Sequence, residues 1–431
     1  MTSERPLAPR CQALRRGDLA VRASVEEACQ RIDAVEHDIA ALVPEPRRRE
    51  RLLAEAEALD RRASEPAAPP PLYGLLVGVK DVIHVDGFVT EAGSAVPSGA
   101  FAGREASSVR ALKDAGALIL GKTITAEFAC SAPNATRNPH NLAHTPGGSS
   151  SGSAAAVAAG YCELALGTQT VGSVIRPAAF CGVVGLKPSM GRIPKDGIVD
   201  YSPTPDTLGL FTQDVAGMAI AASVLCAGWQ ASTPSAHPTL GVPDGPYLEQ
   251  TSSEGREAFE RQVSVLCDAG YRVIRVPMFS DHQQLMDRHY TLITAEMALS
   301  HRDIYAEHAH GYRAETVDVI ERGKTISEAD YMEARSSPIR VRQQIEAAME
   351  ENGIDLWACP AALGPAPAGI DSTGSPFMNL VWTHAGLPAL TVPAGCAANG
   401  LPLGLQLVGR FNADEHLLAW AEGLATVVKD G

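Results

Sequence analysis

The chain has 431 residues, 45% hydrophobic and 20% charged, which is typical of a globular protein rather than a disordered or membrane-embedded one. Its formal net charge of −14 argues against nucleic acid or an anionic membrane as a partner. The first 20 residues lack the apolar core of a secretory signal, and no apolar run reaches the roughly 18 residues of a transmembrane helix.

The nine cysteines are scattered along the chain, odd in number and without a CxxC pair. This pattern predicts free thiols in a reducing compartment and no zinc or other metal site. We therefore expect a cytoplasmic protein that uses no cofactor.

An N-terminal arm, residues 1–70, is predicted to hold two amphipathic helices. Ser24 and Glu27 have the spacing of a capping box, and apolar residues follow at helical intervals as far as Leu42. The second helix is predicted over 46–63, starting on a proline. A Pro/Ala linker over 66–71 ends the arm, which we expect to pack on the main body.

From Tyr73 onwards strands and helices alternate, and this predicts one α/β/α body over 71–431. Its sheet is expected to be large, mixed, mostly parallel and twisted, with helices on both faces. Residues 281–352 form a more polar helical stretch, interpreted as a pocket wall or lid. The predicted strands are 75–83, 117–120, 164–166, 240–242, 271–276, 354–359, 390–393 and 405–408, and the predicted helices are 107–115, 153–160, 214–225, 254–269 and 415–428.

Lys80 lies inside the apolar strand LLVGVKDVI, in a chain that has only seven lysines among its 36 basic residues. Burial disfavours the charged ammonium, so its pKa is expected to fall far enough for neutral lysine to act as a general base. Two alternatives remain open at this point. The ammonium group could reach solvent at the strand end, or it could pair with Asp81.

Two Gly/Ser-rich turns, 147–153 and 167–173, place Ser149 and Ser173 24 residues apart. Ser173 follows an apolar strand, and the backbone N–H groups of Thr170, Val171, Gly172 and Ser173 are candidates for an oxyanion hole. Ser149 could relay a proton between a lysine and a serine nucleophile, because a hydroxyl both donates and accepts. An anion-binding turn is the alternative; a P-loop is excluded by spacing, and no GxSxG elbow is present.

These residues resemble the amidase signature family. The motifs that carry the resemblance are TRNPHNLAHTPGGSSSGSAAAVAAG and ALGTQTVGSVIRPAAFCGVVGLKP, with a second match over 379–422. The resemblance implies a single α/β/α fold and a Ser–cis-Ser–Lys triad. It places Ser173 at the nucleophile, Ser149 at the cis-serine after Gly148 and Lys80 at the base. Ser150 matches a position that supports this network by hydrogen bonding.

The sequence departs from the family's common GTDTGGSIR motif at Gln169, Val171 and Arg176. Val171 stands where a glycine is usual, and a positive φ is not expected for it. The variant resembles a malonamidase-like branch, which implies that Arg176 and Thr168 hold a substrate carboxylate, and it also resembles carbamate-cleaving urethanases. We place Gln169 in the same substrate-binding group. The alternative for Arg176 is a charge pair or an anchor under the loop.

The sequence thus predicts an amidohydrolase that cleaves a linear C–N bond in a small acyl amide, aryl amide or carbamate through a serine acyl-enzyme. Two other functions stay open. One is a malonamate-type amidase; the other is the glutaminase subunit of an amidotransferase. A binding module built on a degenerate amidase fold is disfavoured because all three triad positions are filled. Base rates of oligomer symmetry favour a homodimer.

Overall fold

A single mixed sheet forms the centre of the molecule. The computed structural model describes residues 1–63, 68–130, 132–234 and 236–429. Within these residues ten strands share the sheet, in the spatial order β2 (Leu118–Thr123), β1 (Leu76–Lys80), β3 (Leu164–Gln169), β5 (Thr207–Thr212), β4 (Val184–Lys187), β9 (Ala389–Cys396), β10 (Pro402–Val408), β8 (Leu356–Pro360), β6 (Leu240–Asp244) and β7 (Val273–Pro277).

The two ends of the sheet are parallel and its middle is antiparallel. Strands β2, β1 and β3 run parallel, as do β8, β6 and β7. Between them β5, β4, β9 and β10 pair antiparallel with their neighbours. The large mixed sheet is confirmed, but the expectation that it is mostly parallel is wrong for the described strands. The short strands β4 and β5 were not predicted, and both lie in this antiparallel centre.

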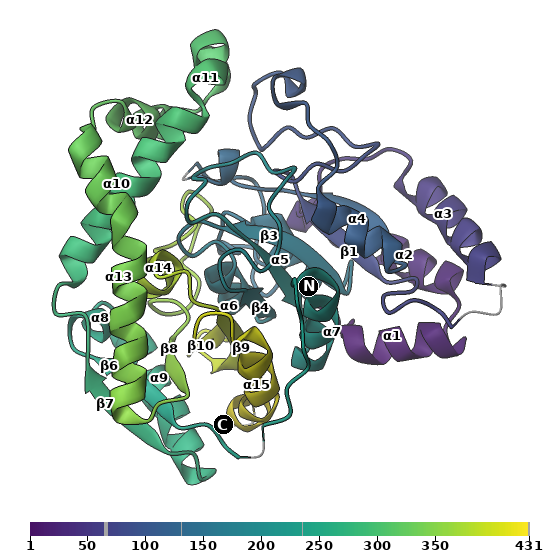
Figure 1. The fold of residues 1–431 in the computed structure, drawn as a ribbon. Helices are drawn as coiled ribbons and strands as arrows, with labels where there is room; N and C mark the ends of the chain where they lie inside the picture. The colour runs from purple at the N-terminus through teal and green to yellow at the C-terminus, as the bar shows by residue number, and fades with distance from the viewer. Residues whose placement is uncertain (64–67, 131, 235, 430–431) are drawn as a thin grey trace.

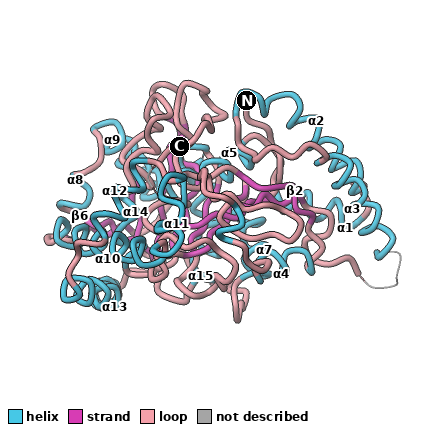
Figure 2. Tube along the Cα trace, turned by 90° about the horizontal axis from the view of Figure 1, so that it is seen from above, coloured by secondary structure: helices cyan, strands magenta, loops and turns pink. Residues whose placement is uncertain are grey.

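Helices cover both faces of the sheet. Figure 2 shows α5 on one side of it and α4, α7 and α15 on the other, and Figure 1 shows α10 to α13 beside the β6–β7 end. The helices are α1 (Leu7–Arg16), α2 (Val21–Ile39), α3 (Arg48–Ala63), α4 (Ser107–Asp114), α5 (Ser151–Ala158), α6 (Ile175–Cys181), α7 (Val215–Leu225), α8 (Pro246–Glu249), α9 (Ser253–Asp268), α10 (His282–Ser300), α11 (Arg302–His308), α12 (Ala314–Gly323), α13 (Glu328–Asn352), α14 (Phe377–His384) and α15 (Asp414–Lys429), with 3-10 turns η1 (Ser98–Phe101), η2 (Glu127–Ala129) and η3 (Ala309–Gly311).

The N-terminal arm differs from the prediction at its beginning. The capping box at Ser24 is wrong, because α2 already begins at Val21 and Ser24 lies buried inside it, where its Oγ accepts from Arg5. Helix α1 was not predicted, although its buried Leu7, Cys11 and Leu14 have the spacing of a helical stripe. The predicted linker over 66–71 lies partly outside the described residues.

The long polar stretch is helical as predicted, since α10 to α13 fill most of 281–352. Helices α6 and α14 were not predicted. None of the described helices is long and apolar enough to cross a membrane.

Four of the elements bring the candidate site residues together. Strands β1 and β3 are parallel neighbours, so their carboxyl ends, with Lys80 and Thr168, lie at the same edge of the sheet. Helices α5 and α6 begin directly after the two serine turns and contact each other. Residues that are 93 positions apart in sequence therefore meet at one edge.

Candidate active site

Lys80 is fully buried at the end of β1, and its ammonium group binds two hydroxyls. Nζ lies 2.7 Å from Ser149 Oγ and 2.7 Å from Thr168 Oγ1. Burial lowers the pKa of Lys80 to about 7, while the negative charge of Asp206 acts in the opposite direction. A substantial fraction of Lys80 is thus neutral near pH 7, with a lone pair directed at a serine hydroxyl.

The alternative partner of Lys80 is occupied elsewhere. Asp81 forms a buried ion pair with Lys122, in which Nζ and Oδ1 are 2.8 Å apart. Lys122 also donates to Thr90 Oγ1. Asp81 is the first residue after β1, and its partners, Lys122 and the N–H of Glu91, are not those of Lys80, so the two side chains have separate surroundings. Neither alternative reading of Lys80, solvent exposure or pairing with Asp81, describes the structure.

Ser149 follows a cis peptide bond from Gly148, as the family resemblance implied. The two carbonyls of this segment are each held by a hydrogen bond. Arg176 Nη2 donates to Gly148 O at 2.5 Å, and the N–H of Ala126 donates to Ser149 O at 3.0 Å. The turn thereby presents the Ser149 hydroxyl to Lys80.

Ser150 joins the serine turn to the end of β3. Its Oγ donates to Thr168 O at 3.2 Å and accepts from Thr168 N at 3.3 Å. Thr168 in turn accepts from Lys80 through its side chain. Ser150 is therefore placed to support the network, and Thr168 contacts the candidate base.

Ser173 lies in the turn between β3 and α6 and is almost buried, with 7% of its surface exposed. Its Oγ makes no hydrogen bond to a described residue, so the link from Ser149 is not closed in this state. Catalytic hydrogen bonds of apo enzymes are often long and tighten when substrate binds. In the described part of the chain the N–H groups of Val171, Gly172 and Ser173 likewise have no acceptor. Val171 has no positive φ, as expected.

Gln169 does not line an open pocket, because its side chain is completely buried. Its Oε1 accepts from the backbone N–H groups of Val174 at 2.8 Å and Ile175 at 3.0 Å. Its Nε2 donates to Thr383 Oγ1 at 2.8 Å. Gln169 therefore caps the start of α6, directly behind the candidate nucleophile.

Arg176 is buried and holds backbone rather than an acidic side chain. Nη1 donates to Gly374 O at 2.6 Å, and Nη2 donates to Gly148 O and to Thr373 Oγ1. Burial lowers the pKa of Arg176 to about 10. These bonds are those of an anchor under the loop, the alternative stated above; binding of a substrate carboxylate by Arg176 stays a prediction.

Two residues of the site were missed by the sequence reasoning. Asp206 Oδ1 accepts from Thr170 Oγ1, and its Oδ2 accepts from the N–H groups of Tyr201 and Ser202. Burial raises the pKa of Asp206 to about 6. The other is Thr383 on α14. It lies in the motif NLVWTHAGLP, which matches the family and could have identified it, whereas no motif marks Asp206.

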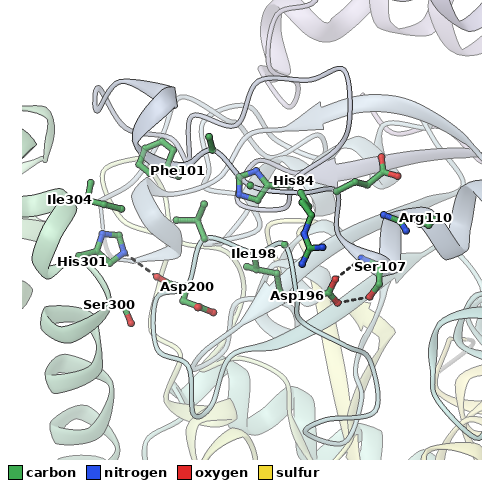
Figure 3. A pocket seen from close by; sticks show the side chains of 16 residues that line it. His84, Phe101, Ser107, Arg110, Asp196, Ile198, Asp200, Ser300, His301 and Ile304 are labelled. Atoms are coloured by element: carbon green, nitrogen blue, oxygen red, sulfur yellow. Dashed lines mark hydrogen bonds between the residues drawn. The ribbon is translucent and has the colours of Figure 1, made fainter.

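A cavity of about 610 Å³ is lined in part by residues 196–200, in the segment that leads to Asp206 (Figure 3). Asp196 accepts from Ser107 within it, and His301 is bonded to the carbonyl of Asp200. Residues of the 190–205 loop and the last residue of α10, Ser300, line this cavity, but Lys80, Ser149 and Ser173 do not, so the wall of the substrate pocket stays a prediction. The wall of the cavity combines apolar, basic and acidic side chains, among them Phe101, Ile198, Ile304, His84, Arg110 and Asp196.

Nothing in the described residues is arranged to hold a metal, because no group of three or more His, Cys, Asp or Glu side chains converges there. A buried amine, that of Lys80, binds the Ser149 hydroxyl, and the turn that carries Ser173 and the backbone N–H groups without a described acceptor follows the neighbouring strand β3. This arrangement suits nucleophilic catalysis at a carbonyl carbon.

A protein-family model described as Amidase matches residues 23–418. Among curated relatives, the glutamyl-tRNA(Gln) amidotransferase A subunit of Oleidesulfovibrio alaskensis is 33% identical and is aligned over 96% of this chain and 95% of its own length. The protein of the same name from Synechococcus sp. is 30% identical, with the same coverage.

The solved structures that this chain resembles include amidases. A crystal structure of an amidase superposes with a TM-score of 0.89 at 29% identity, covering 98% of this chain and 100% of its own. The native peptide amidase from Stenotrophomonas maltophilia superposes with a TM-score of 0.84 at 27% identity, covering 99% and 97%.

Proposed function

Because the chain belongs to the amidase family and is an amide-hydrolysing enzyme, we propose that it cleaves a linear C–N bond in a small acyl amide, aryl amide or carbamate through an acyl-enzyme on Ser173. The observation that carries this proposal is the buried Lys80, hydrogen-bonded to Ser149 beside the Ser173 turn. No metal or cofactor enters the mechanism.

In the first half-reaction Ser173 Oγ bonds to the substrate carbonyl carbon. Its proton passes to Ser149 as the Ser149 proton passes to neutral Lys80. The oxyanion that develops is stabilised by backbone N–H groups of the oxyanion loop, residues 170–173. The protons then return along the same relay to the substrate nitrogen, the C–N bond breaks, and the amine leaves.

In the second half-reaction water attacks the ester carbon. The relay removes a proton from the water and returns one to Ser173 Oγ as the ester bond breaks. The products are a carboxylic acid, or a carbonic acid monoester where the substrate is a carbamate, and the regenerated enzyme.

Ser173→Ala tests this mechanism directly. We expect a loss of at least about 10³-fold in kcat on a chromogenic anilide, because triad members act as a unit and only binding and oxyanion stabilisation remain. Circular dichroism and the melting temperature should stay close to wild type. Wild type, and not the variant, should be labelled at Ser173 by a fluorophosphonate. A variant that keeps near-normal turnover contradicts the mechanism.

The names of the curated relatives favour a second candidate, the glutaminase subunit of an amidotransferase. In that case glutamine would be hydrolysed well only when a partner protein is added. The proposal of an independent amidase predicts turnover of small amides by the isolated chain. Comparing glutamine with a simple aryl amide, using the purified chain alone, separates the two.

The cavity of about 610 Å³ does not inform on the substrate class, because its lining includes none of Lys80, Ser149 and Ser173. A panel of malonamate, an aryl amide and an aryl carbamate compares an anionic acyl amide, a neutral aryl amide and a carbamate as substrates. Strong preference for malonamate would assign Arg176 and Thr168 to a substrate carboxylate.

A further inference from the structure

We infer that Gln169 and Thr383 form a directional hydrogen-bond relay that orients the oxyanion loop, which makes both of them positioning residues for the proposed hydrolysis. The inference rests on the proposed function above, and it replaces the expectation that Gln169 binds substrate. It is carried by five hydrogen bonds among fully or almost fully buried groups.

The amide of Gln169 has only one orientation that satisfies its neighbours. The backbone N–H groups of Val174 and Ile175 both point at the same atom, which must therefore be the carbonyl oxygen. The amide nitrogen is then the atom that faces Thr383 Oγ1, at 2.8 Å. Because an NH₂ group only donates, Thr383 accepts in this bond.

The hydroxyl of Thr383 has one hydrogen left to donate, and two carbonyls lie within reach. Val171 O is 2.6 Å away, and Asn379 O, one turn back in α14, is 3.0 Å away. The shorter contact is the stronger hydrogen bond, so the hydrogen is directed at Val171. The relay thus runs from the Gln169 amide through the Thr383 hydroxyl to the oxyanion loop.

Holding the Val171 carbonyl also fixes the next N–H group. In a trans peptide the carbonyl of Val171 and the N–H of Gly172 point in opposite directions. With the carbonyl bound to α14, the Gly172 N–H is directed away from that helix and stays free of a described acceptor. The same glutamine caps α6 behind Ser173, so one side chain restrains both flanks of the nucleophile.

The polarity of the relay depends on the amide. A carboxylate at position 169 would still accept from Val174 and Ile175, but it would also accept from the Thr383 hydroxyl. The hydroxyl hydrogen would then turn away from Val171, and the loop peptide would lose its restraint. Gln169→Glu therefore tests polarity with almost no change in shape.

Thr383→Val tests the hydroxyl itself, with Thr383→Ser as the conservative rescue and Thr391→Val as the matched control. Thr391 is also buried, but its hydroxyl has no hydrogen-bond partner among the described residues. We expect Thr383→Val and Gln169→Glu to lower kcat by about 10- to 100-fold, part of the 10²- to 10³-fold value of an oxyanion donor. KM should change less than about threefold, with Thr383→Ser and Thr391→Val near wild type.

The rate of fluorophosphonate labelling at Ser173 provides a second readout on the same variants, because it does not depend on the choice of amide substrate. The inference is overturned if Thr383→Val keeps both rates within about threefold, if the loss is in KM alone, or if Thr383→Ser is equally impaired. Should Thr383→Val fail to fold, an unchanged kcat in Gln169→Glu overturns it. Wild type that is neither active nor labelled overturns the proposed function, and the inference with it.

Discussion

Lys80 is an amine with no exposure to solvent, and no carboxylate of a described residue is in direct contact with it. Its two hydrogen-bond partners are neutral hydroxyls, and the charge of Asp206 offsets only part of the cost of burying an ammonium ion. The low pKa follows from this environment. A residue that serves as a neutral base should therefore reduce the stability of the folded state.

Lys80→Met should abolish activity and change the pH dependence of stability. The pKa of Lys80 falls from 10.5 to about 7 on folding, so between these values the unfolded chain binds more protons. The free energy of unfolding of wild type therefore gains with rising pH in this window, and the variant lacks that gain. We expect the melting temperature of the variant, relative to wild type, to fall steadily from pH 7 to 10.

The slope of this relative melting temperature is the test, because removing two hydrogen bonds adds an offset that is independent of pH. A melting temperature of the variant that stays constant or rises relative to wild type over this range would contradict the lowered pKa. Thr383→Val, which leaves Lys80 in place and adds no charged group, provides a weakly active control that should keep the wild-type slope.

At the scale of elements, Asp214 connects the N-terminal arm to the sheet's covering helices. One carboxylate oxygen accepts from Leu7 N at 2.6 Å, and the other accepts from Ala8 N at 3.1 Å and Gly217 N at 2.8 Å. It thus caps the amino ends of α1 and α7 at once. The dipoles of both helix ends favour a negative charge at this position.

Asp214→Ala should lower the free energy of unfolding by about 2–3 kcal/mol, the sum expected for two lost helix caps. Urea unfolding measures the change, and limited proteolysis should cut the chain within residues 1–16 sooner than in wild type. Asp318→Ala is the control, since Asp318 pairs with Arg322 on the surface of α12 and should contribute less than about 1 kcal/mol. Equal effects of the two variants would contradict the double cap.

At the scale of the whole molecule, the core runs without interruption from the arm through the sheet to α15. None of the nine cysteines forms a disulfide, and seven of them are buried in this structure. Only Cys267 and Cys396 are exposed. The number of thiols that react rapidly in the native protein therefore measures whether the seven buried cysteines are protected from solvent.

We expect a thiol reagent to modify two cysteines rapidly in the native protein and all nine in denaturant. A reductant should leave the melting temperature unchanged, because none of the nine cysteines forms a disulfide that could stabilise the fold. Rapid reaction of four or more thiols in the native state would contradict the packing described here. Removing Cys267 and Cys396 by serine substitution should abolish the rapid phase.

Much of the architecture was accessible from local patterns. Buried strands and amphipathic helices have periodicities that a sequence displays directly, so α7, α9, α15 and the outer strands were predicted close to their bounds. Strands β4 and β5 were missed because they pair antiparallel in mid-sheet, where alternation of strand and helix gives no signal, and β4 has only four residues. Helix α6 has only seven residues and depends on Gln169 for its cap.

The family, the large mixed sheet and the three residues proposed for catalysis could be predicted from the amino-acid sequence, because these depend on residue types in continuous motifs. The contacts of Gln169, Arg176 and Asp81 could be known only from the folded chain. Their partners, Thr383, Gly374 and Lys122, are 214, 198 and 41 positions away. Side-chain hydrogen bonds across such separations are set by how the sheet and helices pack, and no local pattern encodes them.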